Sequence, residues 1–135
     1  MSEINVFTFT EYPGLRHCSI SDDSGEEFYH KVLNKEFKKC FENQDFLTVN
    51  LDGTAGYAPS FLDEAFGNLV YDFGLISVKK ILKIISEEET DLIDLLENET
   101  FKQWEQRRVN KVFPKKTIKH DAWFKLIDNN IILSK

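Results

Sequence analysis

The stretch "FLTVNLDGTAGYAPSFLDEAFGNLV", residues 46–70, decides the fold. Its first part alternates apolar side chains with others, which predicts a half-buried strand over residues 46–52. A loop of small residues follows. From Ser60 the apolar residues recur at helical spacing, which predicts a helix that ends at Gly74. A strand, a loop and a helix in this order are typical of an α/β fold.

The regions on either side of this stretch also contain strand patterns. Residues 4–10 alternate, and the turn signal Pro13-Gly14 predicts that they form a hairpin with a short strand over residues 16–20. The isoleucine-rich segment 80–85 predicts a buried strand. Because strands alternate with helices along the chain, we predict an α/β fold with a small mixed sheet of about four strands covered by helices.

A further helix is predicted from Ser24 to about Phe41. Ser24 is followed three residues later by Glu27, which is the spacing of a capping box. Acidic residues around this start also complement the positive end of the helix dipole. Apolar residues recur on one face of the helix, which is expected to pack in the core. His30 lies among polar residues and is expected to face solvent.

The C-terminal third contains two more capping signals. Ser86 and Glu89 predict a helix that closes the main domain, which we place at residues 1–108. Asp121 is expected to cap a short helix near the end of the chain. The segment 109–135 is therefore predicted to be a C-terminal extension packed on the same domain.

The composition is that of an ordinary globular chain. It has 135 residues, of which 41% are hydrophobic, so it has the length of one domain and enough apolar material for a core. No apolar run approaches the ~20 residues that a membrane-spanning helix needs. The N-terminus lacks the basic start and apolar core of a signal peptide. We expect a soluble, cytoplasmic protein that does not bind membranes.

The cysteines and histidines show no spacing that is typical of a metal or catalytic site. Cys18 and Cys40 have no CxxC motif and no paired histidine, so they are expected to be reduced thiols, and no metal or other cofactor is predicted. His17 and Cys18 are neighbours on a predicted strand, where consecutive side chains point to opposite faces. We therefore do not expect them to act as a nucleophile and its base.

Charge is distributed unevenly along the chain. Residues 1–100 contain 20 acidic and 8 basic residues, whereas residues 101–135 contain 3 acidic and 9 basic ones. One alternative is therefore a nucleic-acid-associated subunit that uses the basic residues of segment 102–119. These basic residues are scattered along the segment, however. Their spacing favours a basic segment folded over an acidic body, and we do not predict nucleic acid as the partner.

A small enzyme is the second alternative, with Asp52, Asp63 and Glu64 as its acid–base groups. The sequence contains no GxGxxG, GxxxxGK[ST] or GxSxG motif. Carboxylates in the first turn of a helix ordinarily interact with the helix dipole. We therefore favour a protein without catalytic residues, whose output is binding.

The loop between the central strand and its helix is the most informative position for function. In α/β folds, ligands bind beyond the carboxyl ends of the strands, where such loops lie. Ser60 is expected to cap the helix, with Asp63 three residues further on. The helix start also offers free N–H groups that favour a phosphate. A capping serine and a phosphorylated serine are therefore compatible at this position.

Two segments, "SGEEFYHKVL" at residues 24–33 and "LTVNLDGTAGYAPSFLDEAFGNLV" at residues 47–70, resemble the STAS-like domain family of unknown function. That family is similar to the STAS fold of sulphate transporters and anti-sigma-factor antagonists. The resemblance covers roughly residues 4–97. It depends most on a Ser-Phe-x-(Asp/Glu)-Glu-x-Phe-Gly pattern, matched by Ser60, Phe61, Asp63, Glu64, Phe66 and Gly67. Arg16 matches an arginine that precedes the SGEEF-type helix start in this family.

The resemblance implies a non-enzymatic regulatory module that binds a protein partner. In anti-sigma-factor antagonists the same junction carries a serine that a kinase of the histidine-kinase-like ATPase fold phosphorylates. Ser60 takes this place as a candidate phosphoacceptor, although "APSF" at residues 58–61 replaces the usual Asp-Ser-Ser-Gly. Partner switching with such an ATPase is the implied function. The implied interaction residues are Gly56, Tyr57, Ser60, Phe61, Asp63, Glu64 and Gly67, with Arg16 and Asp52 in support.

Overall fold

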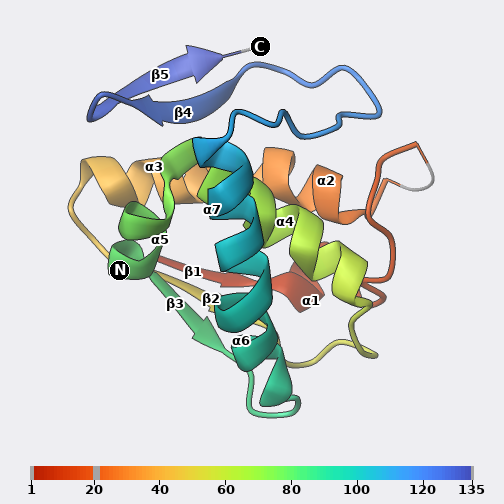
Figure 1. Ribbon diagram of the computed structural model, residues 1–135. Helices are drawn as coiled ribbons and strands as arrows, with labels where there is room; N and C mark the ends of the chain where they lie inside the picture. The colour runs from red at the N-terminus through yellow and green to blue at the C-terminus, as the bar shows by residue number, and fades with distance from the viewer. Residues whose placement is uncertain (1, 20–21, 135) are drawn as a thin grey trace.

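The computed structural model describes residues 2–19 and 22–134 and has three layers (Figure 1). A parallel sheet forms the first layer, helices gather on one of its faces, and a C-terminal β-hairpin lies on the other side of the helices. The elements in chain order are β1 (Ser2–Asn5), α1 (Val6–Phe9), α2 (Gly25–Phe28), η1 (Tyr29–Leu33), α3 (Asn34–Glu42), β2 (Leu47–Asn50), α4 (Pro59–Phe73), α5 (Leu75–Ile81), β3 (Leu82–Ile85), α6 (Asp91–Leu95), η2 (Leu96–Thr100), α7 (Phe101–Val109), β4 (Trp123–Ile127) and β5 (Asn130–Ser134).

The main sheet has the strand order β1-β2-β3, and both pairs are parallel. Ile4, Val49 and Ile84 lie opposite one another in register and face the helices. On the opposite face, Glu3 and Lys83 are exposed. An α/β fold is thus confirmed, but the predicted mixed sheet of about four strands is not. The described residues form this three-stranded parallel sheet and a separate two-stranded antiparallel one.

The predicted N-terminal hairpin is wrong. The strand predicted over residues 4–10 ends at Asn5, and the chain turns into α1, where Phe9 packs edge-on against Phe28 with ring centroids 5.3 Å apart. The carbonyls of Leu15 and Arg16 accept hydrogen bonds from the first N–H groups of α2. These carbonyls therefore complete a helix start instead of pairing with a strand. Ile20, the last residue of the predicted second strand, lies outside the described residues.

The predicted helix from Ser24 is confirmed as α2, η1 and α3, which run without a break to Glu42. The Ser24 hydroxyl accepts a hydrogen bond from the N–H of Glu27 at 3.2 Å, as an N-cap does. The wide π-helical turn η1 lies in the middle, and it rotates the residues that follow it. Here the prediction for His30 is wrong, because its side chain is buried and only 7% exposed.

The central helix is confirmed as α4, and the apolar residues at its helical spacing are buried; they are Phe61, Ala65, Phe66, Leu69, Val70 and Phe73. Gly74 ends it with φ at 85°, a conformation that favours glycine. The chain then forms α5, an unpredicted helix. The strand predicted over residues 80–85 is therefore shorter and begins only at Leu82. The isoleucines of this segment suit a buried helix as well as a buried strand. The spacing of its apolar residues therefore did not distinguish the two kinds of element.

The helix predicted from Ser86 begins later than expected. The Ser86 hydroxyl donates to the backbone carbonyl of Glu89 at 2.6 Å and so closes a turn, while Thr90 is the residue before α6. The predicted capping box is wrong for this reason. From Asp91 the helix runs through α6, η2 and α7 to Val109, in agreement with the predicted end. No helix within the described residues combines the length and the apolar character needed to span a membrane.

The short helix predicted at Asp121 is also wrong, because this region forms the β4–β5 hairpin. Asp128 and Asn129 both have positive φ, at 51° and 66°, as two-residue hairpin turns of type I′ require. The hairpin packs on the helices through Asn34 of α3. The amide of Asn34 exchanges two hydrogen bonds with the backbone of Phe124, each 3.0 Å long.

Candidate functional site

Two loops meet beyond the carboxyl ends of β2 and β3 and form a hollowed acidic surface. The Asp52 carboxylate accepts hydrogen bonds from the backbone N–H groups of Glu87, at 3.1 Å, and Glu88, at 2.9 Å. The Glu88 carboxylate accepts one from the N–H of Gly53 at 2.7 Å. Each loop therefore holds the other in place. We call the depression between them, of about 240 Å³, the acidic hollow; its lining includes Asp52, Gly56, Glu88 and Glu89.

The loop of residues 51–58 is fixed on its other side as well. The N–H groups of Ala55 and Ala58 donate to backbone carbonyls in the connection between α1 and α2. The Tyr57 hydroxyl donates to the first carbonyl past β2, at 2.7 Å. Gly56 has φ at 127°, a conformation that residues with a Cβ rarely adopt. The loop thus presents one defined surface.

Ser60 does not cap α4, contrary to the prediction. Ala58 is the N-cap, with φ at −81° and ψ at 135°, and Pro59 is the first helical residue. Proline suits this position because its φ is already helical and it has no N–H to leave unpaired. Ser60 follows inside the first turn, half-buried, and its side chain makes no capping hydrogen bond. It lies directly beside the fixed loop.

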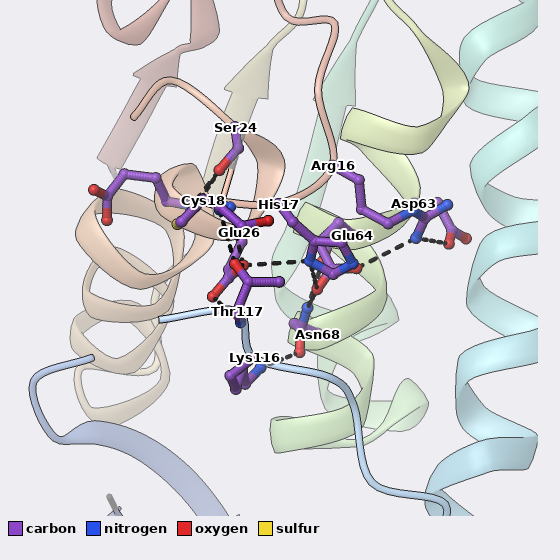
Figure 2. A network of polar contacts seen from close by, with 12 residues as sticks. Arg16, His17, Cys18, Ser24, Glu26, Asp63, Glu64, Asn68, Lys116 and Thr117 are labelled. Atoms are coloured by element: carbon purple, nitrogen blue, oxygen red, sulfur yellow. Dashed lines mark hydrogen bonds and ion pairs between the residues drawn. The ribbon is translucent and has the colours of Figure 1, made fainter. Parts of the chain in front are cut away.

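Arg16 connects the first turns of α4 to the chain before α2 (Figure 2). Its Nη1 lies 2.7 Å from Oδ2 of Asp63 and 3.3 Å from Oε1 of Glu64. The indole N–H of Trp104 donates to the other Asp63 oxygen at 3.0 Å. The Glu64 side chain is 3% exposed, whereas that of Arg16 is 35% exposed. The guanidinium therefore reaches solvent on one side and compensates two carboxylates on the other.

Three of the predicted site residues lie inside the protein. Phe61 is fully buried between Phe28 and Tyr57. Glu64 is buried as described, and Gly67 is buried at the contact between α4 and α7. These three residues therefore pack in the interior and are not part of an exposed interaction surface. By contrast, Asp52, Gly56, Tyr57 and Ser60 are half-buried, and of these Asp52 and Gly56 line the acidic hollow.

The three carboxylates proposed for an enzyme do not all converge on one site. Asp52 lines the acidic hollow, whereas Glu64 lines a separate pocket of about 180 Å³ with Arg16 and His17. Each carboxylate already accepts hydrogen bonds from a backbone or a side chain. Within the described residues, Asp52 thus lies apart from Asp63 and Glu64, and these two carboxylates share the Arg16 guanidinium.

A buried polar network, which the sequence analysis did not predict, is centred on Glu26 at the start of α2 (Figure 2). The Glu26 side chain is fully buried. It accepts hydrogen bonds from the N–H of Cys18 at 3.1 Å, and from the N–H and hydroxyl of Thr117 at 3.1 and 2.7 Å. His17 and His120 also contact it through ring nitrogens. Burial opposes ionisation, but the bonds from Thr117, His120 and Cys18 lower the carboxyl pKa of Glu26 to about 2.

The network continues from Glu64 to the C-terminal segment. Asn68 donates to the Glu64 carboxylate at 2.8 Å, and its own oxygen accepts from the Lys116 ammonium at 2.6 Å. Burial lowers the pKa of Lys116, while the charges of nearby carboxylates, first that of Asp72, oppose this shift. At least this lysine of the basic segment thus points into the acidic body.

His30 joins the same region from η1. Its ring stacks on that of His120, with centroids 3.7 Å apart and planes 9° from parallel. Burial, together with the positive charge of Lys116, lowers the pKa of His30 to about 2, so this ring is neutral. Neither of its nitrogens has a hydrogen-bond partner among the described residues. Thr117 and His120 contact Glu26 from more than 90 positions away, so no local spacing in the sequence signalled these partners.

The fold and the acidic surface define a small α/β domain built on a parallel sheet, with a fixed loop beyond its strand ends. The chain belongs to the family described as STAS-like domain of unknown function (DUF4325), whose model matches residues 24–92, just over half of the chain. This match confirms the predicted family. No curated protein and no solved structure matches the chain. Membership of this STAS-like family suggests a non-enzymatic regulatory module.

Proposed function

We propose that this chain is a regulatory module that docks onto a protein partner through the acidic hollow and the first turn of α4. The mutual hydrogen bonding of the two loops supports this most strongly. Asp52 binds the backbone of the second loop, and Glu88 binds that of the first. A surface that is fixed before binding loses little conformational entropy when a partner docks.

The charge of the surface defines the chemistry of the partner. Asp52, Glu88 and Glu89 line the hollow, and Glu88 and Glu89 are exposed. A partner with a complementary basic patch is attracted to such a surface. Charge reversal at Glu89 is therefore expected to weaken binding, because the Glu89 carboxylate is exposed and its loop is held by other groups. Glu99→Lys, at an equally exposed position on η2, is the matched control.

Ser60 is the proposed point of regulation, with a histidine-kinase-like ATPase as the kinase and partner. Its position in the first turn of α4 places a phosphate at the positive end of the helix dipole, which stabilises it. Arg16, which contacts Asp63 and Glu64 one turn further on, is a cation within reach of the same turn. A phosphate adds about −1.5 to −2 charge, which attracts a basic patch, but it also adds bulk to the docking surface, and we expect the steric effect of this bulk to dominate. We expect it to release the partner.

The test combines a purified histidine-kinase-like ATPase from the same genome with the chain, Mg²⁺ and ATP. Mass spectrometry is expected to locate phosphate on Ser60, and none on Ser60→Ala. In pull-downs, wild type and Ser60→Ala retain the ATPase and Ser60→Asp releases it. Ser77, a half-buried serine in the first turn of α5, supplies the control Ser77→Asp. Equal recovery of the ATPase with wild type, Ser60→Ala and Ser60→Asp would overturn the proposed switch. Recovery with Glu89→Lys equal to that with wild type would overturn the proposed docking surface.

A further inference from the structure

We propose that Cys18, Glu26 and His120 form a binding site for Zn²⁺ that ties the C-terminal segment to the start of α2. The sulphur of Cys18, a carboxylate oxygen of Glu26 and an imidazole nitrogen of His120 all lie within 4.8 Å of one another. In a tetrahedral zinc site the bond lengths place neighbouring ligand atoms about 3.5 Å apart. Only small side-chain rotations are therefore needed to enclose an ion.

The donor set selects the metal. Sulphur, nitrogen and a single carboxylate oxygen are the ligands that zinc prefers, whereas magnesium and calcium prefer oxygen alone. One thiolate and one carboxylate also balance the two positive charges of the ion. The complex is thus neutral, which matters because Cys18, Glu26 and His120 are all nearly or fully buried.

The groups around the ligands already fix them in place. Glu26 is held by the backbone N–H groups of Cys18 and Thr117, and the Cys18 sulphur accepts from the Ser24 hydroxyl at 3.4 Å (Figure 2). The imidazole ring of His120 stacks on that of His30. Outer contacts of this kind orient ligands in metal sites, and their loss typically lowers affinity by about 10–100-fold.

The carboxylate of Glu26 is also surrounded by more partners than it needs. Five polar groups lie within hydrogen-bond distance of its two oxygens. A carboxylate offers about four lone-pair positions. A cation held jointly by Glu26 and His120 replaces their direct contact, so the number of groups around the carboxylate does not rise. With three protein ligands, the fourth position of the ion is left for water or a ligand from a partner.

The site has a structural consequence that is separate from docking at the acidic hollow. Cys18 and Glu26 lie beside the start of α2, but His120 lies in the segment between α7 and β4. Zinc therefore cross-links positions about 100 residues apart and closes that segment over the buried network. Since the metal-binding residues must be brought together by folding, zinc is expected to raise the unfolding temperature.

Cobalt(II) is the probe for the test, because a cobalt–thiolate bond gives a charge-transfer absorption band that excess zinc removes. The full-length chain, freed of metal with a chelator and kept reduced, is titrated with Co²⁺. One equivalent is expected to produce the band in wild type and in Cys40→Ser, and no band in Cys18→Ser. Cys40 is the matched control, since it is the second buried free thiol. His120→Gln is expected to weaken zinc binding at least about tenfold.

A second measurement uses only the wild-type chain, in case a variant does not fold. Zinc is expected to slow alkylation of Cys18 at least about tenfold, mapped by mass spectrometry, and to leave Cys40 unchanged. The absence of a thiolate band in wild type, a band that persists in Cys18→Ser, or equal alkylation with and without zinc would each overturn the proposal.

Discussion

Gly67 of α4 lies directly against the indole ring of Trp104 in α7, so closely that a Cβ at Gly67 would sit 2.2 Å from Cε2 of the ring. Trp104 is 2% exposed and donates a hydrogen bond to Asp63, which holds the indole in place. The pattern Ser-Phe-x-(Asp/Glu)-Glu-x-Phe-Gly thus ends in a glycine because another helix packs on that position.

Gly67→Ala is therefore expected to destabilise the protein by about 1–3 kcal/mol, because the added methyl group must push the two helices apart. Urea unfolding followed by tryptophan fluorescence measures the change. Gly14→Ala is the control, since a Cβ there would meet only a backbone oxygen 3.9 Å away. Equal stability of Gly67→Ala and wild type would show that α7 does not pack at this position.

The two serines at helix starts are expected to differ in their contribution to stability. Ser24 accepts a hydrogen bond from the N–H of Glu27, whereas Ser60 makes no capping bond. Ser24→Ala should cost about 0.5–2 kcal/mol, the usual value of a cap. Ser60→Ala should change stability by no more than about 0.5 kcal/mol. Chemical denaturation of both variants tests this pair, and a larger loss for Ser60→Ala than for Ser24→Ala would contradict it.

The sequence predicted the central strand, the helices α3, α4 and α7, and the family, because each of these depends on local periodicity or a contiguous motif. The wrong predictions also have local causes. The segment that forms α5 and β3 is rich in isoleucine, which suits both kinds of element, so only the positive φ of Gly74 marks where a new helix begins. The hairpin turn at Asp128 and Asn129 lacks the glycine that usually signals a type I′ turn.

The candidate sites were predictable only in part. Asp52, Gly56 and Ser60 belong to one contiguous loop and helix start, so their proximity followed from the sequence. The contact of Glu26 with His120 did not, because it depends on how the segment after α7 returns to α2. A buried glutamate in the first turn of a helix looks the same in sequence as an exposed one that interacts with the dipole.

The buried carboxyl group of Asp72 is expected to make stability depend on pH. Burial raises its pKa from 3.8 to about 6, opposed by the charge of Lys116 and the hydrogen bond from Tyr29. Between these two pH values the folded protein keeps a proton that the unfolded chain releases. The stabilisation is therefore complete below about pH 3.8 and is lost as the pH rises through about 6.

Asp72→Asn tests this linkage, because an amide does not ionise. The free energy of unfolding of wild type should fall more steeply than that of the variant between about pH 4 and 6.5. The other groups that face Asp72, which are Tyr29, Lys116 and Lys125, are present in both proteins. Denaturation curves at several pH values give the difference directly. Parallel pH profiles would mean that the pKa of Asp72 is the same in the folded protein and in the unfolded chain.

Asn34 is expected to control how firmly the β4–β5 hairpin is attached. Its amide donates to the carbonyl of Phe124 and accepts from the N–H of the same residue, and it also donates to the Tyr29 hydroxyl, each at 3.0 Å. Asn34→Ala leaves these groups unpaired at a buried position, which should cost about 1–3 kcal/mol. Hydrogen exchange should show lost protection at the Phe124 amide, while the Val49 amide in the central strand keeps most of its protection. Asn43→Ala, at the exposed end of α3, is the control and should leave both amides unchanged. If the Phe124 amide exchanges at the wild-type rate in Asn34→Ala, contacts other than Asn34 hold the hairpin.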